Sequence, residues 1–337
     1  MEFGLFDHMD YRLEPLSRTY AERLALIRAA EQAGFRAYHL AEHHGTPLGM
    51  APSPGVFLAA VAAVTRQIRL GPMVYCLPLY HPLRLLEEIC MLDNLSNGRL
   101  EVGVGRGASP FETAFFGIDP NEGVDRHVET LRILRAGLAN DRLNHAGRFF
   151  RFDNVPLPLR PVQQPIPFWS APTTPEAQVF AAQSGMHIMT LGPNERVRAV
   201  TTQYLDTWAR EDPAPPRAGR PYVGACRMVH VAATDAAAEA RATPALKLWY
   251  THLAKLWREN KASSPLLSLV ENFDDARAAG MVIAGSPGRV RDELAAQFEF
   301  CRYNYAVLQF AFRDLEHRAA MESLALFVTK VIAEIGE

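Results

Sequence analysis

The sequence is poor in cysteine and in net charge, and it has no long apolar run. Its four cysteines, Cys76, Cys90, Cys226 and Cys301, are scattered without a C-x-x-C pair, which argues against a disulfide framework and a zinc site. The formal net charge of −2 gives no field that would attract nucleic acid or an anionic membrane. No apolar stretch reaches the ~18 residues of a membrane span, and the first residues lack the basic segment of a signal peptide. We therefore expect a soluble, cytoplasmic protein.

What the sequence does have is a steady alternation of short β-like runs and amphipathic helical stretches. The predicted strands cover residues 3–7, 37–41, 68–75, 100–105, 166–170, 188–191, 222–231 and 306–312. The predicted helices cover residues 19–33, 54–65, 82–95, 123–138, 175–183, 194–209, 236–257 and 314–335. Such alternation is typical of parallel strands, and eight units favour a (β/α)₈ TIM barrel over an open sheet.

The chain contains no linker that would divide it, so we expect a single domain over residues 1–337. The proline-rich stretches at 156–175 and 213–221 are interpreted as loops within the alternating pattern. Residues 258–285 break the pattern with a Ser-Ser-Pro turn, and this segment is therefore the candidate for an insertion or mobile lid over the barrel mouth. The active site of such a barrel lies at the carboxyl ends of the strands, so the residues that follow each predicted strand are the informative ones.

A carboxylate and two histidines follow the second predicted strand: Glu42, His43 and His44. An imidazole at this edge can take up a proton near neutral pH and serve as a general base, and an adjacent carboxylate can orient it. Consecutive side chains of an extended segment point in different directions, and no further set of ligands is visible, so a metal site is the less favoured alternative. A structural hydrogen-bonding role for at least one of the histidines stays open.

A glycine-rich stretch follows at residues 103–108, where Gly103, Gly105 and Ala108 satisfy the G-x-G-x-x-G/A pattern of dinucleotide-binding proteins. That pattern requires a helix that opens within the glycines, whereas the next predicted helix begins only near residue 123. We therefore reject nicotinamide binding here. Arg106 is interpreted as an anion contact, because a guanidinium forks onto phosphate oxygens, with an ion pair at the barrel rim as the alternative.

Hydroxyl side chains follow the fifth predicted strand, at Ser170, Thr173 and Thr174, ahead of a helix that opens at Pro175. The free N–H groups and the dipole at the start of that helix favour an anion site. A plain threonine N-cap explains the same residues equally well, so both interpretations stay open.

Several segments, in order along the chain, match one family. The chain resembles the bacterial luciferase-like flavin monooxygenases, in particular the flavin-binding luciferase subunit, over nearly its whole length. The likeness is carried by Phe3-Gly4-Leu5-Phe6, Gly34-Phe35, Ala41-Glu42-His43-His44, Leu77-Pro78-Leu79-Tyr80-His81-Pro82-Leu83-Arg84, Glu87-Glu88, Leu92-Asp93, Ser96-Asn97-Gly98-Arg99, Gly105-Arg106-Gly107 and Gly285-Ser286-Pro287.

The resemblance implies a barrel that binds reduced FMN non-covalently, activates O₂ as a C4a-peroxyflavin and oxygenates a small organic substrate such as an aldehyde or ketone. It implies that His43 is the catalytic histidine. The flavin site that it implies consists of Phe6, Met73, Val74, Arg106, Arg126, Ser170, Ala171 and Thr174. The arginines and the last three residues would meet the phosphate, and Met73-Val74 falls where the family often has a non-prolyl cis peptide.

This chain also departs from the family pattern. It has Ser170-Ala171 where the luciferase loop has a Glu-Ser pair, which removes a carboxylate from the phosphate neighbourhood. Residues 258–285 show little likeness, so aldehyde specificity and light emission are not carried over. Two alternatives keep the same fold: an F420-dependent oxidoreductase that transfers hydride, and a non-catalytic flavin-binding paralogue.

Two kinds of partner are expected. The lack of a nicotinamide fingerprint fits a two-component system, in which a separate NAD(P)H:flavin reductase supplies reduced FMN. The second and third predicted helices carry small residues such as Ala59 and Ala60, and together with the family resemblance they suggest a homodimer. Packing of these helices on the barrel is the alternative explanation for their small residues.

Overall fold

The computed structural model of the chain describes residues 1–210, 219–263, 267 and 271–335. Its centre is a parallel sheet in the order β3-β2-β1-β12-β10-β9-β8-β5-β4, and β11 pairs with β10. These strands are β1 (Glu2–Asp7), β2 (Ala37–Leu40), β3 (Arg69–Pro72), β4 (Tyr75–Cys76), β5 (Val102–Gly105), β8 (Phe168–Ser170), β9 (His187–Thr190), β10 (Val223–Val231), β11 (Val282–Gly285) and β12 (Tyr305–Gln309).

The sheet closes into a barrel because its two ends are neighbours in the chain. β3 and β4 are separated by only two residues. Leu100, two residues before β5, forms a bridge with Leu70 of β3, and Val104 of β5 pairs with Tyr75 of β4. If β3 and β4 are taken as one interrupted strand, the described barrel has eight strands, and β11 is an addition beside the end of β10. The predicted TIM-barrel fold is confirmed.

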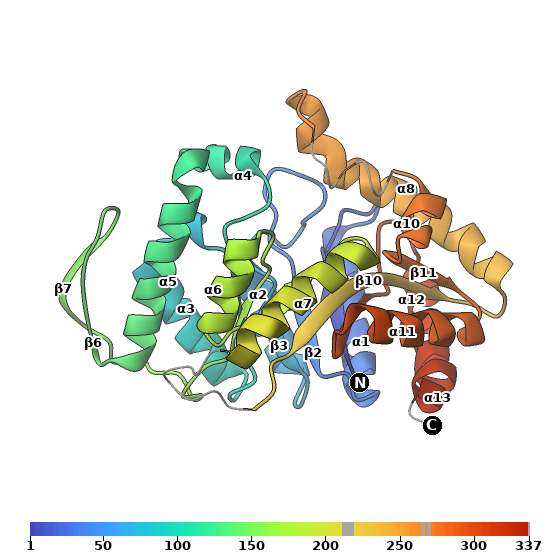
Figure 1. Ribbon diagram of the computed structural model, residues 1–337, viewed down its shortest axis with the longest axis horizontal. Coiled ribbons are helices and arrows are strands. Elements are labelled where there is room, and N and C mark those ends of the chain that lie inside the picture. Colours follow the sequence, from blue (N-terminus) through green and yellow to red (C-terminus); the bar gives the residue numbers. More distant parts are fainter. Residues whose placement is uncertain (211–218, 264–266, 268–270, 336–337) are drawn as a thin grey trace.

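Helices surround the barrel on its outer side (Figure 1). They are α1 (Leu16–Gln32), α2 (Pro54–Val64), α3 (Pro82–Leu95), α4 (Pro110–Phe115), α5 (Gly123–Ala139), α6 (Pro175–Gln183), α7 (Asn194–Arg210), α8 (Asp235–Glu259), α10 (Phe273–Ala278), α11 (Pro287–Cys301), α12 (His317–Leu326) and α13 (Ala333–Ile335), with a π-helical stretch at Phe327–Ile332 between the last two. Proline opens α2, α3, α4, α6 and α11, where its fixed φ suits the first turn and its missing N–H costs no helical bond.

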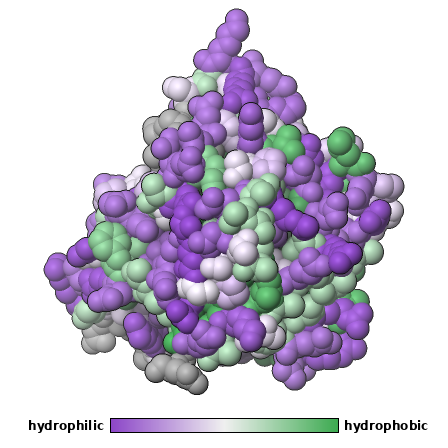
Figure 2. Space-filling view, turned by 90° about the vertical axis from the view of Figure 1, so that its right-hand side faces the viewer, coloured by the Kyte–Doolittle hydropathy of each residue, from purple (hydrophilic) through white to green (hydrophobic). Residues whose placement is uncertain are grey.

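The strands are buried on both faces, as a parallel sheet covered by helices requires. Every residue of β2, β11 and β12 is buried. This explains why most strands appeared in the sequence as short apolar runs without alternation. The face of the molecule in Figure 2, over α10 and α11, is mostly hydrophilic with small separate apolar areas. Among the described residues, no helix is long and apolar enough to cross a membrane.

Glycines in β5 allow the barrel to close tightly. The peptide bond between Met73 and Val74, which joins β3 to β4, is cis. A Cβ atom on Gly103 would lie 2.2 Å from the carbonyl oxygen of Pro72, and one on Gly105 would lie 2.4 Å from Cγ2 of Val74. Only glycine fits at such distances, so the G-x-G spacing is explained by the close approach of two chain segments.

Four elements outside residues 258–285 differ from the sequence predictions. The helix α11, which Pro287 opens, was missed altogether. The strand predicted at 68–75 is divided into β3 and β4. The short helix α4 forms in a predicted loop, because the Ser109 side chain caps it by accepting a bond from Glu112 N. An exposed antiparallel hairpin of β6 (Arg142–Ala146) and β7 (Arg151–Pro156) was missed and extends away from the barrel at the left of Figure 1.

The lid predicted at residues 258–285 is not confirmed. Its first residues belong to the end of α8, residues 273–278 form α10, and residues 282–285 form the buried strand β11. Residues 264–266 and 268–270 lie outside the described residues, as does most of the proline-rich loop predicted at 213–221. A four-residue strand within an irregular segment is too short for hydrophobic periodicity to reveal.

A buried ion cluster fills the amino-terminal end of the barrel. The fully buried carboxylate of Glu101 accepts bonds of 2.5 to 2.9 Å from Arg36, Arg69 and the indole N–H of Trp169. Burial alone would raise the pKa of Glu101. The hydrogen bonds and charge of Arg36, with the charge of Arg69, outweigh burial and lower that pKa to about 2. The cluster lies at the end of the barrel where stability, rather than chemistry, is determined.

Candidate active site

The carboxyl ends of the strands bring predicted site residues from distant parts of the chain together. Phe6 lies near the end of β1, His43 just after β2, Met73 and Val74 between β3 and β4, and Arg106 just after β5. Phe6 and Met73 belong to one buried apolar cluster, and Val74 packs against it. The mouth of the barrel therefore has an apolar surface on the side where these residues meet.

His43 is held by a carboxylate that sequence reasoning missed. Its Nδ1 lies 3.2 Å from Oε1 of Glu112, and Oε2 of Glu112 accepts a bond of 2.8 Å from the backbone N–H of His44. Glu112 lies in α4, the helix absent from the sequence prediction. A carboxylate at Nδ1 places the proton there and leaves Nε2 as an acceptor, which is the arrangement of an oriented general base.

His44 points the other way, into a separate buried network. Its Nε2 lies 2.9 Å from Oε1 of Glu42. The other oxygen of Glu42 accepts bonds from the Tyr80 hydroxyl at 2.8 Å and from the backbone N–H of Cys76 at 3.2 Å. The expected divergence of the two histidines is confirmed, and His44 has the structural hydrogen-bonding role. No cluster of three or more ligand-type side chains that could hold a metal ion is found in the described part of the chain.

His8, which sequence reasoning also missed, joins several rings at the site. Its imidazole lies 4.8 Å from the ring of Phe6, 5.7 Å from that of His43 in a stacked arrangement and 5.4 Å from that of Trp249 in α8. Burial and the neighbouring charge of His43 lower the pKa of His8 to about 3, although a hydrogen bond with Gln309 opposes them. His8 is therefore neutral at physiological pH.

A pocket with about 60 Å³ of open volume lies beside His43. Its polar lining is His43, Thr46, Ser109 and Glu112, and its apolar lining is Leu48, Ala108, Leu253, Leu256, Trp257 and Leu267. The second half of α8 supplies three of the apolar residues, and α8 and α4 lie on the same upper side of the barrel in Figure 1. The lining contains one carboxylate and no arginine or lysine, so it favours neutral ligands.

Arg106, just after β5, packs against the start of α5, and Arg126 belongs to the first turn of that helix. The stem of Arg106 packs on Gly123, where a Cβ atom would be 3.3 Å from Cγ of Arg106. Arg126 is one turn further along the helix, where it pairs with Glu122 at 3.0 Å and lies 4.2 Å from the ring of Phe149. Within the described ranges Arg106 has no ion-pair partner, so the rim ion pair considered for it is absent.

The loop after β8 begins next to the strand that leads to Arg106, because Ser170 pairs with Val104 of β5. Thr174 is the N-cap of α6, and its hydroxyl accepts a backbone hydrogen bond of 3.3 Å. The threonine N-cap is confirmed. Ala171 and Thr174 are exposed, and the anion site at this helix start stays a prediction.

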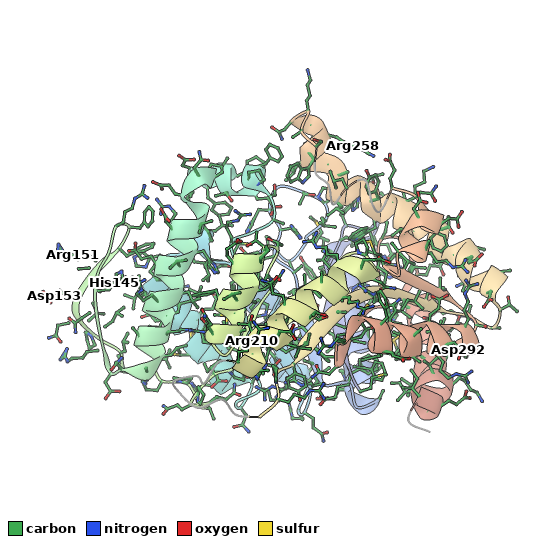
Figure 3. All side chains as sticks on the ribbon, in the orientation of Figure 1. His145, Arg151, Asp153, Arg210, Arg258 and Asp292 are labelled. Atoms are coloured by element: carbon green, nitrogen blue, oxygen red, sulfur yellow. The ribbon has the colours of Figure 1, made fainter. Side chains whose placement is uncertain are left out.

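The turn of the β6–β7 hairpin is anchored near these arginines. The carboxylate of Glu129 accepts bonds of 2.9 to 3.2 Å from the backbone N–H groups of residues 148–150. Arg148 also pairs with Glu122 at 2.8 Å. Arg151, labelled in Figure 3, lies on the far side of the hairpin and is exposed.

Two of the relatives among known proteins match different lengths of this chain. The uncharacterized protein y4wF of Sinorhizobium fredii is 39% identical over 337 residues, which are 100% of this chain and 98% of that protein. The oxygenase component of the flavin-dependent trigonelline monooxygenase of Acinetobacter baylyi is 33% identical over 193 residues, 56% of this chain and 53% of that protein.

Solved structures share the fold over nearly the whole chain. Monooxygenase RslO1 of Streptomyces bottropensis has a TM-score of 0.89 at 25% identity, with 99% of each chain covered. The oxygenating constituent of 3,6-diketocamphane monooxygenase of Pseudomonas putida, in complex with FMN, has a TM-score of 0.79 at 20% identity, covering 99% of this chain and 98% of that one. An F420-dependent secondary alcohol dehydrogenase has a TM-score of 0.76 at 18% identity, with 98% of each chain covered. Below 25% identity the likeness shows the fold alone.

The family model of luciferase-like monooxygenases matches residues 1–301, which include His43, Glu112, both arginines and the loop after β8. With an end-to-end relative at 39% identity, this match fixes the family of the whole barrel. The chain belongs to the luciferase-like monooxygenase family.

Proposed function

We propose that the protein is a monooxygenase that uses reduced FMN and O₂ to oxygenate a small organic substrate such as an aldehyde or ketone, with His43 as the catalytic histidine. The observation that supports this best is the His43–Glu112 pair, which lies between the apolar surface of the barrel mouth and the pocket under α8. When bound, reduced FMN supplies the electrons with which one oxygen atom of O₂ is transferred to the substrate. The protein binds and orients both reactants and excludes water.

The chemical types of the side chains at the barrel mouth suit the ring and the phosphate of FMN. The proposed contacts are Phe6, Met73 and Val74 for the flavin ring, and Arg106, Arg126, Ser170, Ala171 and Thr174 for the phosphate. An apolar surface suits the ring system, and two guanidinium groups suit a dianion. The absent carboxylate in the loop after β8 favours phosphate binding, because it removes a like charge from that end of the site.

In this proposal His43 holds and moves a proton beside the flavin. Its Nε2 is the acceptor, and Glu112 at Nδ1 stabilises the imidazolium that forms when the proton arrives. Replacing His43 with alanine should leave FMN binding unchanged and lower turnover by about 10²–10⁴-fold. Unchanged product formation by His43→Ala, measured with a substrate found by screening carbonyl compounds, would contradict this role.

The two alternatives remain outcomes of the same experiments. An F420-dependent enzyme would bind a longer and more acidic cofactor tail, which the carboxylates of Glu122 and Asp125 beside Arg126 and Arg148 disfavour. A non-catalytic flavin-binding protein would not need the His43–Glu112 pair to be intact.

The first test is an anaerobic titration of the purified protein with reduced FMN, followed by rapid mixing with oxygenated buffer while the flavin absorbance is recorded. We expect saturable binding and a slow, multi-step return to oxidised flavin. Immediate oxidation, as in free solution, would contradict a monooxygenase, and tight binding of F420 in place of FMN would support the hydride-transfer alternative.

A second titration compares FMN with riboflavin, which lacks the phosphate. The change Arg106→Ala should weaken binding of FMN by about tenfold or more and leave riboflavin binding unchanged, because a charge-assisted bond to phosphate is lost. Arg151→Ala on the exposed hairpin is the matched control and should change neither affinity. Equal FMN affinity in Arg106→Ala and the control would refute the phosphate role of Arg106.

Two partners belong to the proposal. A separate NAD(P)H:flavin reductase is proposed as the source of reduced FMN, and a relative described as an oxygenase component supports such an arrangement. A homodimer is proposed through α2 and α3, where Val56, Met91 and Leu95 are 76%, 53% and 59% exposed. Light scattering should give the mass of a dimer that Met91→Glu dissociates, and a monomeric wild-type protein would contradict it.

A further inference from the structure

We propose that His8 and Trp249 select a substrate that is apolar except for one un-ionised hydroxyl group, and that they hold this hydroxyl beside His43. The hydroxyl belongs to an alcohol, a phenol or the enol form of a ketone. The inference rests on the function proposed above, because it takes the substrate site to extend from the 60 Å³ pocket beside His43 to His8 and Trp249. Neither residue lines that pocket itself, but His8 stacks on His43 and contacts Trp249. It adds the two residues that orient the substrate and the chemical group that they recognise.

Apart from Nε2 of His43, which the proposed proton transfer uses, the polar groups that line this pocket are already bonded within the protein. The hydroxyl of Thr46 donates to the carbonyl oxygen of His252 at 3.1 Å, and the Ser109 oxygen accepts from Glu112 N. The Glu112 carboxylate is shared between the imidazole of His43 and a backbone N–H. Recognition of a polar substituent therefore requires other donors and acceptors near His43.

Trp249 provides a donor that the fold leaves unused. Its side chain is 6% exposed, and its indole N–H is buried without a hydrogen-bond partner among the described residues. Trp249 precedes the pocket residues Leu253 and Leu256 by four and seven positions in α8, so it lies on the same face of that helix. Because buried donors are nearly always paired, an acceptor on a bound ligand is the natural partner for this N–H.

His8 provides an acceptor next to that donor. The amide nitrogen of Gln309 donates to the carbonyl oxygen of Ala311, which directs the amide oxygen toward Nδ1 of His8 at 3.2 Å. Nδ1 therefore carries the proton, and Nε2 keeps its lone pair. In the described part of the chain, Nε2 has no hydrogen-bond partner. Burial keeps the pKa of His8 far below neutrality, so this acceptor persists at physiological pH.

A donor and an acceptor on touching rings suit a hydroxyl group better than other groups. A hydroxyl can donate to Nε2 of His8 and accept from the N–H of Trp249, whereas a carbonyl oxygen can use only the second bond. A carboxylate meets no cation here, because the pocket lining has no arginine or lysine and Glu112 repels it. The stacking of His8 on His43 brings the bound hydroxyl, and the carbon that bears it, next to the proposed catalytic base.

The test uses three probes that share a methylphenyl group: 4-methylphenol, toluene and 4-methylbenzoate. Their binding to the protein saturated with oxidised FMN is measured by calorimetry, and the measurement is repeated without FMN. We expect 4-methylphenol to bind about tenfold more tightly than toluene, and 4-methylbenzoate to bind most weakly. Trp249→Phe and His8→Phe keep an aromatic ring and should each lower the affinity for 4-methylphenol by about fivefold, with toluene unaffected.

Trp257→Phe is the matched control, because Trp257 lines the same pocket and packs edge-on against Phe111. It should lower the affinities for 4-methylphenol and toluene equally. Tightest binding of 4-methylbenzoate, or a preference for 4-methylphenol that survives both Trp249→Phe and His8→Phe, would overturn the proposal. Absence of binding by all three probes while FMN binds would also overturn it. If the probes bind with the expected preference but FMN does not bind, the proposed function is contradicted, whereas the proposed recognition of a hydroxyl group is supported.

Discussion

Replacing Glu101 with glutamine removes the negative charge from the ion cluster at the amino-terminal end of the barrel. The guanidinium of Arg36 then stays buried beside Trp169 with only the more exposed Glu2, at 3.4 Å, as a counter-ion, and Arg69 loses its partner. Breaking a buried pair in this way costs ~3–5 kcal/mol of unfolding free energy. The cost should appear in urea unfolding at pH 7, followed by tryptophan fluorescence.

The pH dependence gives a sharper check of the same reasoning. A pKa of about 2 in the folded chain, against an ordinary value of 4.5, corresponds to ~3 kcal/mol of stability from ionised Glu101 at pH 7. Because the pKa is lowered by folding, this stabilisation is complete above pH 4.5 and is lost as the pH falls toward 2. At pH 3.5 about 2 kcal/mol remains, so the difference in unfolding free energy between wild type and Glu101→Gln should narrow by ~1 kcal/mol.

The control for both measurements is Glu322→Gln, which breaks an exposed pair with Arg318 and should change stability little at any pH. A Glu101→Gln variant as stable as the wild type at pH 7 would refute the claim that the ionised carboxylate of Glu101 stabilises the folded barrel. A difference that stayed constant from pH 7 to pH 3.5 would refute the lowered pKa.

Two further changes probe the mouth of the barrel. Gly105→Ala should weaken FMN binding in the anaerobic titration, because its Cβ would displace Val74 from the proposed flavin surface, whereas Gly288→Ala, where the nearest atom is 4.0 Å away, should bind FMN normally. Glu112→Gln keeps the size of the side chain but not its charge, and it should lower turnover by ~10–100-fold with FMN affinity unchanged. An unaltered rate of product formation would show that Glu112 is not needed to orient His43.

The fold was largely predictable because its strands recur between helices with clear starts. Proline at the first position marks several helices, and buried strands such as β12 appear as apolar runs. Apart from the fifteen-residue helix α11, what escaped prediction depended on short or local signals. β11 has four residues, α4 depends on a single serine cap, and only two residues separate β3 from β4. Each of these features is too short to alter the hydrophobic periodicity of a sequence window, and that periodicity is the signal from which strands and helices are predicted.

Site residues could be predicted only where they stand in a recognisable sequence motif. His43 and Arg106 stand in segments that resemble a known family, so their positions at the strand ends followed from the fold. His8, Glu112 and Trp249 meet His43 from elements far apart in the chain, and nothing in their local sequence marks these contacts. Such partners become visible only when the barrel brings the ends of β1 and β2 under α8.

The opposite orientations of His43 and His44 make this short segment sensitive to length. One imidazole meets Glu112 at the pocket, and the other meets the buried carboxylate of Glu42. A single-residue deletion ahead of Glu42 would move His44 to the place of His43 and His43 to the buried place of Glu42. The ring with a free nitrogen would then be sealed inside the wall of the barrel, although the chain would still contain both histidines. The order of side chains along the backbone is thus as much a part of this site as their identity.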